Sequence, residues 1–244
     1  MIINPYVFNT SATDPYWANV VLLVDGSNEA DSSTPATIDV TGKTPTFNGV
    51  GANQAQCKTN QFKFGSSSVY FNANTACRLT FADSADWAMG TGDATWEAWV
   101  RPEGNTGATR IWISNAASVG GFYSVQGNSN GSNLFYRAVS NGTTTFFGTG
   151  HAITTDAWHH LAITRQGANL YGYIDGVGEL TSSALSGVTL LDSTGEMCIG
   201  SYSNADHAST GWKGWIDQVR ITKGVARYPN GTTFTPPTAA FPHS

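Results

Sequence analysis

The sequence has few charged side chains. Asp, Glu, Lys and Arg make up 12% of the 244 residues, about half of their usual share of roughly 25%. The net charge is −5, and the 12 Lys and Arg residues form no run along the chain. Because nucleic-acid-binding proteins usually carry a basic patch, we expect no nucleic acid partner.

Long apolar runs are also missing. No stretch approaches the roughly 18–20 consecutive apolar residues that a membrane-spanning helix needs, so no membrane insertion is expected. The first residues, MIINP, carry neither a basic region nor a long apolar region, which predicts that the chain has no signal peptide. If the protein acts outside a cell, we expect it to leave by another route, such as cell lysis.

Cysteine is scarce. The sequence has an odd number of cysteines, Cys57, Cys77 and Cys198, and no two of them have Cys-x-x-Cys spacing. This excludes a disulfide framework and a cysteine zinc site as organising features. We interpret the three as small buried side chains. The alternative is a disulfide between Cys57 and Cys77, which could form if their strands are neighbours.

Short apolar and aromatic segments separated by turn residues dominate what is present. Strands are expected at 20–24, 68–71, 77–81 and 95–101, and later at 110–114, 121–126, 133–140, 144–148, 158–165, 170–174, 177–182, 196–202 and 215–222. Asp175-Gly176 between two apolar runs predicts a tight hairpin. No sustained helical period occurs, and a single helical turn is expected near 84–88. So many short strands favour an all-β sandwich or jelly roll.

The segment 95–101 alternates cleanly between two faces. Period-2 geometry puts Trp96, Ala98 and Val100 on one face, and Glu97, Trp99 and Arg101 on the other.

Several segments together resemble laminin-G-like domains of the concanavalin A-like lectin/glucanase superfamily. They are 17–26 (WANVVLLVDG), 63–65 (KFG), 69–71 (VYF), 79–81 (LTF), 93–102 (DATWEAWVRP), 158–165 (WHHLAITR), 173–176 (YIDG) and 214–221 (GWIDQVRI). The resemblance runs from about residue 14 to the C-terminus. It implies an all-β, two-sheet antiparallel jelly-roll sandwich, a frequent calcium site near the chain ends, and frequent glycan binding. We therefore expect an N-terminal arm at 1–15, a jelly-roll domain at 16–232 and a Pro-rich tail at 233–244 that runs extended along the surface.

The ends of the chain are similar to those of bacteriophage virion proteins. Residues 222–228 (TKGVARY), followed by 234–237 (FTPP), and the leader 1–8 (MIINPYVF) carry this likeness. It implies an extracellular place on the virion surface, as a tail fibre, head fibre or decoration protein. The leader is too apolar for a solvated tail, so we predict that it docks on another virion protein or on a neighbouring subunit of a homo-oligomer. The alternative is that it folds back onto its own domain.

Catalysis is not expected. Glucanases of this superfamily resemble one another in a Glu-x-Asp-x-x-Glu strand whose acids share one face. The nearest approach here is Glu29-Ala30-Asp31, where no further acid follows at the required spacing. Glu97 stands alone on its strand, and we interpret such acids as scattered surface groups. His159 and His160 point to opposite faces and cannot share a metal; we expect one ring packed inside and one solvated.

The resemblance implies that acidic residues in two strands lie near calcium. Asp25 and Asp217, with Asp31 and the backbone carbonyls of 26–28, could supply the oxygens that calcium prefers. The alternative is that Asp25 caps a turn and that Asp217 pairs with Arg220 or another cation.

Glycan binding needs flat aromatic rings beside planar polar groups at an exposed patch. The candidate rings lie on predicted strands: Trp99, Trp112, Tyr123 and Tyr136. Each could instead belong to the core. Two functions therefore compete, a surface glycan-binding module on a virion and a purely structural capsid or tail decoration protein without a small ligand.

Overall fold

The computed structural model describes residues 13–26, 29–34, 38–74, 76–104, 109–115, 121–128, 134–140, 143–148, 153–182, 185–190, 193–201 and 211–244. For 109–111, 180, 182 and the described strands between 121 and 148, it describes the backbone alone.

The larger of two antiparallel sheets has eight strands. In spatial order they are β13 (Val177–Ser182), β12 (Asn169–Ile174), β11 (His159–Gln166), β6 (Ala94–Pro102), β15 (Lys213–Lys223), β4 (Ser68–Asn72) and β3 (Gln56–Lys58), and β1 (Val20–Val24) pairs with the second half of β15. We call it the eight-stranded sheet.

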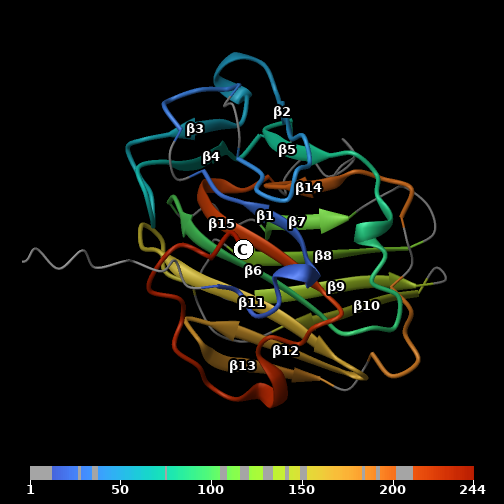
Figure 1. Ribbon diagram of the computed structural model, residues 1–244. Helices are drawn as coiled ribbons and strands as arrows, with labels where there is room; N and C mark the ends of the chain where they lie inside the picture. Colours follow the sequence, from blue (N-terminus) through green and yellow to red (C-terminus); the bar gives the residue numbers. More distant parts are fainter. Residues whose placement is uncertain are drawn as a thin grey trace, which may run out of the picture.

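The second sheet lies behind the first in Figure 1 and has seven strands. In spatial order they are β10 (Thr143–Gly148), β9 (Leu134–Ser140), β8 (Gly121–Asn128), β7 (Thr109–Asn115), β14 (Met197–Ile199), β5 (Arg78–Phe81) and β2 (Thr46–Asn48). Two antiparallel sheets face to face make a jelly-roll sandwich, as the sequence predicts. The described helices are single 3-10 turns, η1 (Trp17–Asn19), η2 (Gly51–Asn53), η3 (Ala85–Trp87) and η4 (Pro229–Gly231), and none of them could cross a bilayer.

The core lies between the two sheets. Trp96, Ala98 and Val100 of β6 are fully buried in it, and Trp112 of β7 contributes to it from the opposite sheet. The alternation predicted for 95–101 is therefore confirmed. Burying a larger apolar side chain such as Val100 stabilises a fold by about 1.5–3 kcal/mol, which makes this register costly to shift.

Local signals mark the turns correctly. Asp175 and Gly176 have φ angles of 50° and 77° between β12 and β13, which confirms the predicted hairpin. A Cβ on Gly176 would lie 2.0 Å from the backbone oxygen of Phe234, so the close approach of the C-terminal segment also requires glycine there. The predicted turn near 84–88 is η3, where the Ser84 hydroxyl accepts a hydrogen bond from the Asp86 N–H at 3.2 Å.

The three cysteines are free and buried, which confirms their interpretation as small buried side chains. Burial raises the pKa of the Cys57 and Cys198 thiols to about 12, so neither forms a thiolate at neutral pH.

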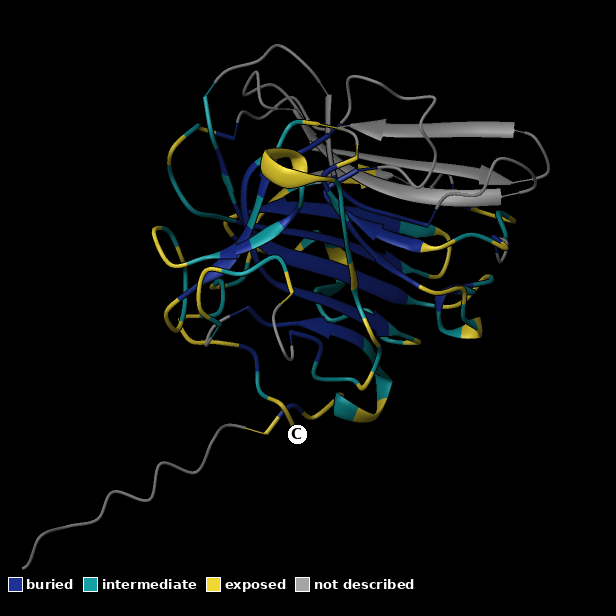
Figure 2. Ribbon diagram, turned by 90° about the horizontal axis from the view of Figure 1, so that it is seen from above, coloured by how far each residue is buried: buried dark blue, intermediate teal, exposed yellow. Residues whose placement is uncertain are grey.

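Segments from both ends of the chain cover the outer face of the eight-stranded sheet, the face turned away from the core. The C-terminus lies in front of β6 and β15 in Figure 1 and on the outer side of this sheet in Figure 2. Asp14 is 6% exposed and Phe241 is 2% exposed. The sequence analysis assigned Asp14 to an arm and Phe241 to a surface tail. Both instead pack into the domain, because Asp14 binds Arg220 and Arg227 and the Phe241 ring contacts Arg220. Residues 1–12, and with them the predicted docking segment 1–8, lie outside the described residues.

Candidate functional site

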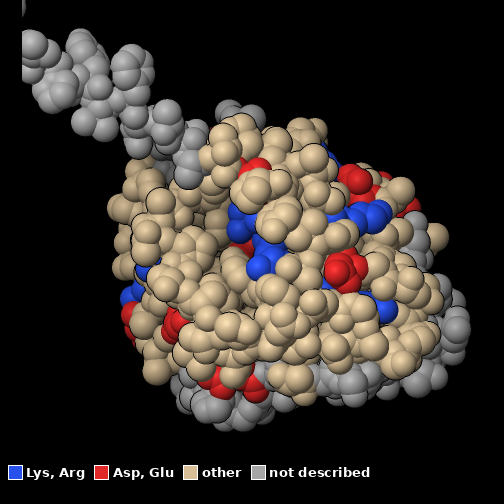
Figure 3. Space-filling view, turned by 60° about the horizontal axis from the view of Figure 1, so that its bottom comes forward, with Lys and Arg blue, Asp and Glu red and all other residues tan. Residues whose placement is uncertain are grey.

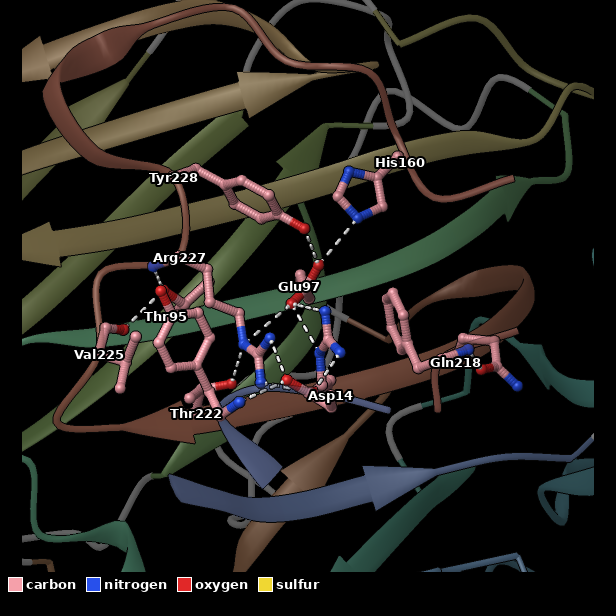
Figure 4. Close-up of polar contacts among 12 residues, drawn as sticks. Asp14, Thr95, Glu97, His160, Gln218, Thr222, Val225, Arg227 and Tyr228 are labelled. Atoms are coloured by element: carbon pink, nitrogen blue, oxygen red, sulfur yellow. Dashed lines mark hydrogen bonds and ion pairs between the residues drawn. The ribbon is translucent and has the colours of Figure 1, made fainter. Parts of the chain in front are cut away.

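A buried charged cluster occupies the middle of the outer face of the eight-stranded sheet (Figure 4). Glu97 of β6 is 0% exposed. Its carboxylate accepts hydrogen bonds from Arg220 Nε at 2.8 Å and from the Tyr228 hydroxyl at 2.7 Å, and His160 Nε2 lies 3.2 Å away. The interpretation of Glu97 as a surface acid is therefore wrong, because its partners come from strands and a tail distant in sequence.

Asp14 joins the two ends of the chain to this cluster. Arg227 binds it in a bidentate manner, with Nη1–Oδ1 at 3.0 Å and Nη2–Oδ2 at 2.7 Å. Arg220 Nη1 donates to the same carboxylate at 2.8 Å. Arg227 also donates to Thr222 of β15 at 2.6 Å. One carboxylate before β1 thus fastens both β15 and the segment that follows it.

The ionisation of Glu97 follows from these partners. Burial alone would raise its pKa, but the attraction of Arg220 and the hydrogen bonds from His160 and Tyr228 lower it to about 2. Glu97 is therefore charged at neutral pH and has a structural role. A glycosidase acid must exchange protons with a substrate, and a fully enclosed carboxylate held by an arginine is not placed to do so.

The two adjacent histidines diverge, as their position on a strand predicts. The His160 ring is buried against Glu97, whereas His159 Nδ1 lies 2.7 Å from Asp175 Oδ2 and its Nε2 lies 2.8 Å from the Thr154 hydroxyl. The expectation that one ring is solvated is wrong, since the His159 side chain is only 13% exposed.

Aromatic rings seal the cluster from solvent. Tyr228 and Phe234 stack with centroids 3.7 Å apart, and Phe234 meets His160 edge-on. The Arg220 guanidinium lies 3.9 Å from the centre of the Phe241 ring. These contacts explain why the Pro-rich tail runs back across the sheet.

Two of the four predicted glycan-binding rings, Trp99 and Trp112, are buried. Trp99 is 5% exposed and lies between Phe64, His160 and the amine of Lys63, which is 3.8 Å from its ring centre. Trp112 is fully buried in the core. Both predictions of exposed rings are wrong, because each strand face is covered, one by the opposite sheet and the other by Lys63 and Phe64. The side chains of Tyr123 and Tyr136 lie outside the described residues.

Asp217 is an unusual buried carboxyl group on β15. It is 2% exposed, and its Oδ2 accepts hydrogen bonds from the N–H groups of Lys63 at 3.0 Å and Phe64 at 3.2 Å. Its Oδ1 has no hydrogen-bond partner within the described part of the chain. Burial, with the nearby charge of Asp25, raises the pKa of Asp217 to about 7. Arg220 binds Glu97 and Asp14, so the alternative in which it pairs with Asp217 is wrong.

Two of the three predicted calcium ligands, Asp25 and Asp217, are suited to bind a cation. Asp25 and Asp217 are both buried carboxylates close enough to interact, and the unpartnered Oδ1 is the kind of hard oxygen that calcium prefers. Asp31 does not fit, because Thr59 and Lys58 bind its two oxygens. Among the residues that the structure describes, no group of three His, Cys, Asp or Glu side chains is arranged to hold a metal ion. A cation here would therefore depend on two carboxylates completed by carbonyl and water oxygens.

A small cavity opens farther along the same outer face. Its volume is about 170 Å³, and its walls are Lys58, Asn60, Tyr70, Glu103 and Trp215. Sequence reasoning missed these residues. They come from or adjoin β3, β4, β6 and β15, and only the strand register brings them together. Elsewhere, on the face shown in Figure 3, acidic and basic residues lie in small mixed groups without a large area of one sign.

Comparisons with known proteins give a consistent picture. A family model described as the concanavalin A-like lectin/glucanases superfamily matches residues 72–227. No curated protein that was compared matches the sequence.

Solved structures share the fold at low identity. The binding domain of Paraclostridial Mosquitocidal Protein 1 is 16% identical, with a TM-score of 0.64 over 86% of this chain and 50% of that one. Domain 4 of AbnA, an extracellular arabinanase from Geobacillus stearothermophilus solved with arabinotriose, is 18% identical, with a TM-score of 0.60 over 88% of this chain and 98% of that one. The ligand binding domain of botulinum neurotoxin serotype D, solved with N-acetylneuraminic acid, is 14% identical, with a TM-score of 0.59 over 86% of this chain and 49% of that one. The chain thus spans about half the length of the toxin domains that it matches.

Proposed function

Since the chain belongs to the concanavalin A-like lectin/glucanases superfamily, we propose that it is a non-catalytic carbohydrate-binding module. The superfamily contains sugar binders and sugar hydrolases, and the state of Glu97 favours the first. It is the single acid of β6, and Arg220, His160 and Tyr228 enclose it completely. Retaining and inverting glycosidases need a pair of carboxyl groups that reach the scissile bond.

Two similar structures support a sugar ligand. One was solved with arabinotriose and another with N-acetylneuraminic acid, so the fold accommodates quite different sugars. A fold alone does not give a function, and the proposal therefore combines this likeness with the enclosure of Glu97.

We also propose that Asp25 and Asp217 hold a calcium ion. The unpartnered Oδ1 of buried Asp217 supports this. A bound cation would neutralise the two carboxylates and brace β1 against β15. Asp25 lies beside the C-terminal His243, whose Nε2 is 2.9 Å from its Oδ2.

For the biological setting, we propose a place on the surface of a bacteriophage virion, as a fibre or decoration protein in a homo-oligomer. The likeness of segments 222–228 and 1–8 to virion proteins supports this setting. A purely structural decoration protein is the second candidate, and the experiment below separates it from a lectin.

The test is a glycan array probed with the intact labelled chain, in calcium and in chelator, with heat-unfolded chain as the control. The proposal predicts saturable binding to a defined set of glycans that the free sugar displaces. A folded protein that binds no glycan above the unfolded control would contradict the lectin function and favour the structural role.

A further inference from the structure

Tyr70 and Trp215 line the small cavity on the outer face of the eight-stranded sheet, and Arg101 lies beside Trp215. Trp215 of β15 lies opposite Tyr70 of β4 on one side and Arg101 of β6 on the other. The rings of Tyr70 and Trp215 are 4.9 Å apart and inclined at 49°, and the Arg101 guanidinium lies 5.2 Å from the Trp215 ring centre. The strand register therefore places these three residues side by side.

Polar groups surround these rings. The Tyr70 hydroxyl donates to Glu103 Oε2 at 2.9 Å, and the indole N–H of Trp215 donates to Asn60 Oδ1 at 3.3 Å. Burial, then the hydrogen bond to Glu103, raises the pKa of Tyr70 to about 12, so its hydroxyl keeps its proton and holds the carboxylate in place. Within the described residues, Glu103 Oε1 and Asn60 Nδ2 make no hydrogen bond. One oriented acceptor and one oriented donor are thus available to a ligand.

The arrangement matches the chemistry of a sugar ring. A sugar presents a C–H face that packs on an aromatic surface, and neighbouring hydroxyls that both donate and accept hydrogen bonds. The volume of about 170 Å³ is smaller than the roughly 300–1,000 Å³ of sites that enclose drug-sized ligands, so it suits one ring. The charges of Lys58 and Glu103 are opposite, which favours a neutral ring over an anionic one.

We propose that the cavity between Lys58, Asn60, Tyr70, Glu103 and Trp215 binds one neutral sugar residue at the end of a glycan chain. The inference rests on the carbohydrate-binding function proposed above and assigns it a site. The half-buried Tyr70 ring and the small exposed part of Trp215 contact the sugar face. Glu103 accepts from one hydroxyl, Asn60 donates to another, and the Lys58 amine, which also lies 3.4 Å from Asp31 Oδ2, donates with a remaining N–H. The rest of the glycan extends into solvent from the rim.

A larger cavity elsewhere is less suited to this role. It has a volume of about 290 Å³ and is lined by residues that include Lys43 and Phe81. The Lys43 amine already binds Asp86 at 2.9 Å and the Val21 carbonyl at 2.6 Å, and Phe81 is 1% exposed. It therefore offers no aromatic surface comparable to the half-buried Tyr70 ring.

The experiment compares Glu103→Gln and Asn60→Ala with the wild-type chain, using the glycan that binds best on the array. Glu196→Gln, on an exposed turn before β14, is the matched control. We expect each cavity variant to weaken the Kd by about tenfold, which is the effect of losing roughly 1.4 kcal/mol, with an unchanged Tm. The control should bind like the wild type. Trp215→Ala is avoided as the main variant, since Trp215 is only 7% exposed and its loss can affect folding.

The outcomes separate the two proposals. If the wild type binds no glycan, the proposed function fails. If the wild type binds but both cavity variants bind equally well with unchanged Tm, the function stands and this site is wrong. Competition with neutral and anionic methyl glycosides tests the ligand class. Displacement by anionic sugars alone would overturn the neutral assignment, whereas displacement by a neutral glycoside supports it.

Discussion

Replacing Glu97 by Gln should destabilise the protein strongly. The change preserves the shape of the side chain but removes the charge that faces Arg220 at 2.8 Å. Arg220 is 5% exposed. In the variant, Asp14 would be the one carboxylate left to pair with Arg220, and Asp14 also pairs with Arg227. Removing one partner of a buried ion pair costs about 3–5 kcal/mol, because the other charge stays in a poorly solvated place.

The pKa of Glu97 gives a second estimate of how much its charge stabilises the fold. Its partners lower the pKa from 4.5 to about 2, which corresponds to about 3 kcal/mol at 1.36 kcal/mol per pH unit. A depressed folded-state pKa means that this stability is present above pH 4.5 and is lost as the pH falls toward 2. The difference in unfolding free energy between the wild-type chain and Glu97→Gln should therefore shrink as the pH falls from 4.5 to 2.

Urea denaturation followed by circular dichroism measures both effects. We expect the variant to lose about 3–5 kcal/mol of unfolding free energy at pH 7, while the exposed control Glu196→Gln changes it by less than about 0.5 kcal/mol. Other carboxyl groups with lowered pKa values, such as Asp14 and Asp175, also weaken the fold in acid. The difference between the two chains isolates Glu97. A loss below about 1 kcal/mol at pH 7, or a difference that does not change between pH 5 and pH 2, would refute the reasoning.

The remaining predictions concern Asp217 and the arm. The raised pKa of Asp217, about 7 against an ordinary 3.8, means that the folded state holds a proton which the unfolded chain releases, so metal-free stability falls as pH rises from about 4 to 7. Asp217→Asn should abolish this decline and raise the Tm at pH 8 in chelator, measured by scanning fluorimetry; an unchanged or lower Tm would contradict the burial argument. Calcium should raise the wild-type Tm at pH 8 by mass action and leave Asp217→Asn unaffected, whereas an equal response of both chains would place calcium elsewhere. Deleting residues 1–12 retains Asp14 and should leave the Tm nearly unchanged while reducing the oligomer to a monomer in light scattering; unfolding of the truncated chain would show that the arm belongs to its own core.

Local patterns predicted the elements that depend on neighbours in sequence. The alternation of 95–101 placed Trp96 in the core, and Asp175-Gly176 identified its hairpin, because side-chain period and positive φ are properties of a few consecutive residues. The strands β2 and β3 were not predicted, since three residues each are too few to show a period.

The covered face could not be predicted in the same way. Glu97 was placed on the correct side of its strand, but its partners His160, Arg220 and Tyr228 lie up to 131 positions away in the sequence. A bulge in β15 between Asp217 and Arg220 sets which of these side chains faces Glu97. The cavity around Trp215 depends likewise on strand register, which pairing geometry fixes and composition does not reveal.

The most direct test of the central claim is a calorimetric titration of the intact chain with its best glycan, with the glycan then recovered and weighed by mass spectrometry. A non-catalytic lectin predicts saturable heat and a glycan of unchanged mass after prolonged incubation. A cleaved glycan, or no saturable heat from a glycan that the array identified, would contradict the account.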